Sequence, residues 1–131
     1  MPPRVVSVRV EGFPRVQTRL RRLGANRKMV NVGLDAAAIV IARRARRLVP
    51  VDTGRLKRSI RIDPARGRKP AWVRAGYERR QPNYARFVHD GTRHVRGRPF
   101  LTNAQLQTRR QQLSAFTRAA RRELRRFLRR R

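Results

Sequence analysis

The chain has 131 residues, which is enough for one domain and short for two. Its 36 basic and 7 acidic residues give a formal net charge of +29, and all but three of the basic residues are arginine. The charge predicts a polyanionic partner, such as nucleic acid, an anionic membrane surface or an acidic protein. The absence of cysteine excludes a disulfide framework, a thiolate zinc site and a thiol nucleophile.

Hydropathy argues against membrane insertion. The longest apolar run spans only residues 36–42, far below the roughly 18 residues that a membrane-spanning helix needs. The N-terminal residues alternate in polarity, so we expect no secretory signal. These patterns predict one soluble domain.

The first predicted elements are a strand and a short helix. Valine alternates with polar or charged residues from Val6 to Val10, which is the period-two pattern of a half-buried strand. Apolar residues then recur every three or four positions from Phe13 to Leu23, and Pro14 stands where a first helical turn tolerates proline. We expect Gly24 to end this helix.

A longer amphipathic helix is predicted from about Asn26 to Leu48. Its apolar stripe consists of Val30, Leu34, Ala37, Ala38, Ile41, Ala45 and Leu48. The ring of Pro50 disfavours helical geometry at Val49 and so ends the helix. We expect the stripe to pack against a sheet, with Ile41 in the core.

Two further strands are predicted between residues 59 and 77, because polarity again alternates with a period of two. The turn-rich segment Pro64–Pro70 between them indicates a hairpin. Periodicity leaves residues 84–89 open between a strand and a helical turn, and the segment Gly91–Pro99 is expected to be a loop. An arginine-rich amphipathic helix, with a net charge of +9 from residue 107 onward, is expected over about residues 103–131. Its apolar stripe consists of Leu106, Leu113, Phe116, Ala120, Leu124, Phe127 and Leu128.

The order of these elements predicts an α+β fold. A small mixed or antiparallel sheet would pack on the long helix, with the C-terminal amphipathic helix completing a single domain over residues 1–131.

Catalytic chemistry finds little support in the sequence. The seven acidic residues form no close pair for acid–base catalysis, and no phosphate-binding or dinucleotide-binding glycine motif is present. His89, Asp90 and His94 are close in sequence, but their spacing matches no standard zinc pattern and arginines surround them. We therefore expect neither an enzyme nor a metal or cofactor site.

Three segments resemble one known family. They read PVDTGRLKRSI at residues 50–60, YARFVHDGT at 84–92 and GRPFLTNA at 97–104. In this order and at this spacing they are similar to the tail-component family of tailed bacteriophages, whose members are called tail-completion, neck or head–tail joining proteins. The resemblance spans roughly residues 5–130. Where the family usually has glutamate before its Gly-Thr pair, this chain has His89, followed by Asp90.

The resemblance implies a structural role in the virion. Such a protein would assemble as a ring, most plausibly a hexamer, between the head-completion or connector protein and the tail terminator or tail tube. DNA would pass through the ring without sequence-specific contact, and assembly would take place in the host cytoplasm. A ring needs two different contact patches on each subunit.

The candidate residues for contact with a neighbouring subunit or ring come from the three segments. They are Pro50, Asp52, Thr53, Gly54, Leu56, Tyr84, His89, Asp90, Gly91, Thr92, Arg98, Pro99 and Phe100. Locally, Asp52 or Thr53 is suited to cap a new helical turn, and Gly54 permits a positive φ angle.

The C-terminal arginines are candidates for contact with a polyanion: Arg121, Arg122, Arg125, Arg126, Arg129, Arg130 and Arg131. Two other interpretations remain open. One is a small basic nucleic-acid-binding protein, although the low aromatic content and the lack of a recognised reading motif argue against it. The other is a C-terminal helix lying on a membrane surface, which leaves the sheet and the three segments unexplained.

Overall fold

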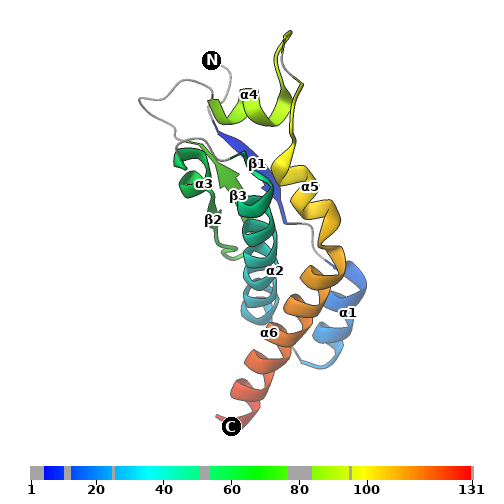
Figure 1. Cartoon of the computed structure of the whole chain (residues 1–131). Helices are drawn as coiled ribbons and strands as arrows, with labels where there is room; N and C mark the ends of the chain where they lie inside the picture. Colours follow the sequence, from blue (N-terminus) through cyan, green and yellow to red (C-terminus); the bar gives the residue numbers. More distant parts are fainter. Residues whose placement is uncertain are drawn as a thin grey trace.

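A computed structural model describes residues 5–10, 13–24, 26–50, 54–76, 84–94 and 96–130. The predicted α+β class is confirmed (Figure 1). In chain order the described elements are β1 (Val6–Arg9), α1 (Pro14–Arg22), α2 (Arg27–Leu48), α3 (Arg55–Ser59), β2 (Arg61–Asp63), β3 (Trp72–Ala75), α4 (Tyr84–Asp90), α5 (Phe100–Gln107) and α6 (Arg109–Arg129).

The three strands form one antiparallel sheet in the order β1-β3-β2. The register places Val8 opposite Val73 on one side and Ile62 opposite Val73 on the other, so apolar residues of all three strands share one face. The alternation read from the sequence set this face, because a shift of one residue would turn every valine outward. The predicted hairpin is β2 and β3.

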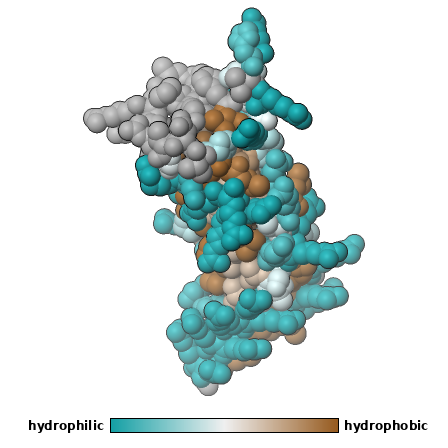
Figure 2. All heavy atoms as spheres, viewed as in Figure 1, coloured by the Kyte–Doolittle hydropathy of each residue, from teal (hydrophilic) through white to brown (hydrophobic). Residues whose placement is uncertain are grey.

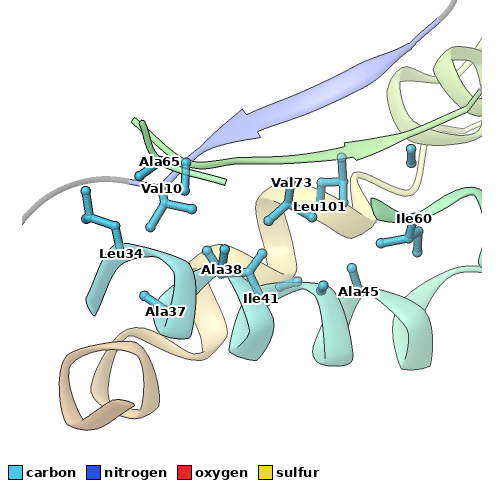
Figure 3. Packing of buried hydrophobic residues seen from close by; sticks show 14 of the residues in the cluster. Val10, Leu34, Ala37, Ala38, Ile41, Ala45, Ile60, Ala65, Val73 and Leu101 are labelled. Atoms are coloured by element: carbon cyan, nitrogen blue, oxygen red, sulfur yellow. The ribbon is translucent and has the colours of Figure 1, made fainter. Parts of the chain in front are cut away.

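Helix α2 packs its apolar stripe on this face, as predicted (Figure 3). Ile41, Ala38 and Ala45 are fully buried, and Val73 lies across from them. The helix begins where the Asn26 side chain accepts a hydrogen bond from the Met29 amide at 3.1 Å, and it ends at Val49, which is extended before Pro50.

Helix α6 packs extensively against α2, so α2 contacts both the sheet and a second helix. At Gly33 the fully buried ring of Phe116 occupies the space that a side chain would need. Phe13, which precedes α1, stacks on the same ring at a tilted angle with 5.2 Å between centroids.

The C-terminal helical region differs from the prediction. Helix begins at Phe100 rather than near residue 103, and it is interrupted at Thr108, whose φ of −117° and ψ of 22° depart from helical values. Thr108 Oγ1 donates to the Ala104 carbonyl at 2.6 Å, and the buried Gln112 amide donates to the Gln105 carbonyl at 2.7 Å. These bonds satisfy the polar groups freed by the break.

Only part of the predicted apolar stripe is buried. Leu106, Leu113, Phe127 and Leu128 are exposed and Leu124 is partly exposed, whereas Phe116 and Ala120 are buried as expected. The segment left open by periodicity is helix α4, and residues 55–59, for which the sequence suggested only a new turn, form the short helix α3.

Candidate functional site

The turn after α2 contains the first group of interface candidates. Asp52 and Thr53, with their expected capping role, lie outside the described residues. Gly54 has a φ of +78°, in the left-handed region anticipated from the sequence, and it begins α3. Pro50 and Gly54 are partly exposed, whereas Leu56 is buried in the core.

A buried serine ties α3 to the sheet. Ser59 Oγ donates to the Leu56 carbonyl at 2.6 Å and accepts a hydrogen bond from the Gly76 amide at 2.9 Å. The end of α3 is therefore held beside the end of β3.

Helix α4 contains the second group, and its central candidate is mostly enclosed by the chain itself. The His89 side chain is 8% exposed and lies 2.8 Å from the Asp90 carboxylate through Nδ1. Because an ionised carboxylate only accepts hydrogen bonds, Nδ1 is the donor. The ring packs edge-on against Phe100 at 5.3 Å, and Nε2 faces the Thr102 hydroxyl at 3.5 Å. His89 thus joins α4 to α5. The carboxylate of Asp90, whose side chain is 58% exposed, is the acidic group that this segment offers at the surface.

The loop between α4 and α5 is folded closely onto α4. The Arg98 amide donates to the Val88 carbonyl at 2.7 Å. A Cβ on Gly97 would lie 2.5 Å from the carbonyl carbon of Asp90, so only glycine permits this approach. The described residues of this loop are therefore held against α4.

Exposure divides the remaining candidates. Thr92 and Arg98 are exposed, and Gly91 and Pro99 are partly exposed. Phe100 is buried in the core, so only its neighbours are accessible. The side chain of Tyr84 lies outside the described part of the structure. Figure 1 places α3, α4 and the loop before α5 at one end of the molecule, and the C-terminus of α6 at the other.

The C-terminal arginines line the opposite end of the fold. Arg121, Arg122, Arg125, Arg126, Arg129 and Arg130 are all exposed, and Arg131 lies outside the described residues. Of the six described arginines in this group, only Arg126 has a carboxylate partner, Glu123 at 3.8 Å, and Glu123 also lies 3.7 Å from Lys28. The other five described arginines of the group present uncompensated charge to solvent.

Sequence reasoning missed a second set of arginines. Arg43, Arg44 and Arg47 lie off the apolar stripe of α2, and packing brings them beside the start of α6, where Arg44 Nε donates to Gln107 Oε1 at 3.0 Å. Helical periodicity shows that they lie off the apolar stripe; it does not show which helix stands next to them.

Asp35 of α2 is a partly buried carboxylate. Burial raises the pKa of Asp35 above its usual value, and a hydrogen bond from the Ala65 amide at 2.7 Å works in the opposite direction. This residue joins α2 to the loop after β2 and has a structural role.

The described residues include neither a metal-binding cluster nor a membrane-spanning helix. They contain no group of three or more histidine, cysteine, aspartate or glutamate side chains able to hold a metal ion. None of the described helices is long and apolar enough to cross a membrane.

Comparison with known proteins identifies the class. Residues 15–91 match the family model described as "Bacteriophage HK97-gp10, putative tail-component". The match covers more than half of the chain, from α1 to the residue after α4, and the chain belongs to this HK97-gp10-like family of phage tail components. Of the three segments singled out in the sequence, those at 50–60 and 84–92 lie within the matched region, except for Thr92. The segment at 97–104 and helix α6 lie beyond it. Comparisons with curated proteins and with solved structures gave no match.

Proposed function

We propose that the protein is a non-enzymatic component of the phage neck, which forms a homo-oligomeric ring between the head and the tail. The ring, most plausibly a hexamer, would join the head-completion or connector protein to the tail terminator or tail tube, and the DNA would pass through its channel. Assembly would take place in the host cytoplasm. The family match over residues 15–91 is the observation that carries this proposal.

The arrangement of the two surfaces supports a ring. Helix α3 and the loop before α5 lie at one end of the fold, and the arginine-rich end of α6 lies at the other. A subunit with distinct surfaces can make the heterologous contacts that close a ring. The hydrogen bonds of Ser59 hold the end of α3 on the sheet, and the close packing of Gly97 holds its loop on α4, which lowers the entropic cost of contact at these surfaces.

Charge sets a condition on assembly. Six copies would carry a formal charge of six times +29, or +174, which opposes ring closure unless anionic partners are present. Non-specific contact with DNA phosphates, acidic neighbouring proteins, or both would supply the opposite charge.

The turn after α2 offers the direct test. We expect Asp52→Ala and Gly54→Val to reduce the yield of infectious particles in a complementation assay, with heads unjoined to tails in electron micrographs. Gly54→Asn is the matched control, because asparagine tolerates a positive φ whereas valine is strained there. Circular dichroism must show that each variant is folded.

Two results would contradict the proposal. One is a normal particle yield from both Asp52→Ala and Gly54→Val. The other is a strongly preferred DNA sequence, bound on the order of a thousandfold more tightly than random DNA at physiological salt, which is typical of a dedicated DNA-binding protein.

A further inference from the structure

A groove runs along the exposed junction of α2 and α6. It consists of two adjoining hollows of about 780 and 540 Å³, which share Val40 and Arg43. A third hollow, of about 510 Å³, is lined by α6 alone and adjoins the larger one at Arg118 and Arg122. Along α6 the groove extends from Thr108 to Arg122, a length of about 21 Å at 1.5 Å per helical residue. This is the length of a helix of about four turns.

The floor of the groove is apolar and made mostly of small side chains. Ala36, Ile39 and Val40 of α2 face Ala115 and Ala119 of α6 across it. Ile39 is 43% exposed although it is a large aliphatic residue. Small residues let another helix approach closely, and a partner that covered Ile39 would remove apolar surface from water.

The walls of the groove are cationic. Arg43, Arg44 and Arg47 stand on α2, and Arg110, Arg118 and Arg122 stand on α6. No acidic side chain lines the groove among the described residues. Arg44 donates to the Gln107 side chain and Arg118 to the Ser114 hydroxyl, and because both acceptors are neutral the two charges remain uncompensated. Where α2 and α6 pack, Figure 2 shows long hydrophilic side chains around smaller apolar areas on the visible face.

We propose that this groove binds an acidic amphipathic helix of another protein. The helix would place its apolar side on the floor and its carboxylates against the arginines, which is a recurring mode of peptide recognition. The inference rests on the proposed function only in taking the partner to be another virion protein.

The groove distinguishes this partner from two others. Duplex DNA would engage the arginines, but its phosphates would gain nothing from the apolar floor. A second copy of this chain would bring its own α2 and α6 arginines, and like charges would repel. Only an acidic helix uses both the floor and the walls.

The test measures binding of a synthetic peptide to the purified full chain at physiological salt. The peptide has about 18 residues, with leucine and alanine along one helical face and glutamate elsewhere. A scrambled peptide of the same composition has no continuous apolar face, and duplex DNA of about 18 base pairs provides the purely electrostatic comparison. We expect the amphipathic peptide to bind at least roughly tenfold more tightly than the scrambled peptide.

The variant Ile39→Lys tests the contribution of the apolar floor to binding separately from the contribution of the positive charge. It removes the apolar contact while adding a cation, so we expect affinity for the peptide to fall roughly tenfold and affinity for DNA to stay equal or rise. Leu23→Lys is the matched control, because Leu23 is an exposed leucine that lines none of the three hollows. Thermal unfolding must show that both variants remain folded.

A second pair of variants tests the walls. Arg43→Gln with Arg118→Gln should weaken peptide binding more than Arg27→Gln with Arg68→Gln, which removes equal charge outside the groove. Equal binding of the two peptides, or unchanged peptide affinity in Ile39→Lys, would overturn the groove proposal. Because the test uses purified protein, such a result leaves the particle-assembly test of the neck function unaffected.

Discussion

The contact between Gly33 of α2 and Phe116 of α6 leaves no room for a side chain at position 33. A Cβ at Gly33 would lie 2.7 Å and 2.8 Å from Cδ2 and Cε2 of the Phe116 ring. The ring is fully buried and is held on another side by Phe13 at 5.2 Å between centroids, so it has no open space to move into. Gly33→Ala must therefore push α2 and α6 apart or force the ring out of its rotamer.

Two opposing effects decide the size of the change. Replacing glycine by alanine inside a helix ordinarily stabilises it by about 1 kcal/mol. Overpacking a close-packed core costs about 1–3 kcal/mol. Since the contact lies well below ordinary van der Waals distance, we expect overpacking to prevail, with a net loss of about 1 kcal/mol in the free energy of unfolding.

Urea denaturation followed by circular dichroism measures this difference. Ala36→Gly, at a partly exposed position of the same helix, calibrates the propensity effect and should cost about 1 kcal/mol. The double variant Gly33→Ala with Phe116→Leu should be less destabilised than the sum of its parts, because the smaller side chain makes room for the methyl group. If Gly33→Ala alone is as stable as the original chain or more stable, the reasoning from the close contact is refuted.

Three further outcomes test the core, the buried carboxylate and the cationic tail. Ile41→Asp would bury an unpaired charge where the side chain is fully enclosed, so we expect the domain to unfold, and a melting temperature equal to that of the original chain would remove Ile41 from the core. The raised pKa of Asp35 means that the folded state binds its proton more tightly than the unfolded state does, so this residue adds stability as pH falls and the gain is lost as pH rises through the folded pKa. Asp35→Asn retains an oxygen that accepts from the Ala65 amide, so we expect equal or greater stability at neutral pH and loss of this pH dependence; a loss of more than about 1 kcal/mol in neutral urea titrations would contradict the assignment. Deleting residues 125–131 removes five arginines, so DNA affinity should fall equally for random and selected sequences, with a shallower salt dependence. Competition binding across a salt series measures this, and a loss confined to one sequence would argue against purely electrostatic contact.

The sequence by itself determined the features that depend on local chemistry. Alternating valines set the face of the sheet, and the stripe around Ile41 set the buried side of α2, because side-chain direction follows backbone periodicity. Pro50 ended the helix, and Gly54 adopted the positive φ that glycine permits. The first two sequence segments also led to the family that residues 15–91 match.

Tertiary structure alone decided how these elements meet. Helices α5 and α6 are separated at Thr108, and packing on α2 buries Phe116 and Ala120 of α6 while Leu106 and Leu113 remain exposed. Likewise, the placement of Arg43 beside α6 follows from the close approach at Gly33, which no periodicity encodes. The periodicity of the sequence determines which side of a helix is apolar. Contacts between residues distant in the chain determine which element packs against that side. The groove between α2 and α6 exists only because of such contacts.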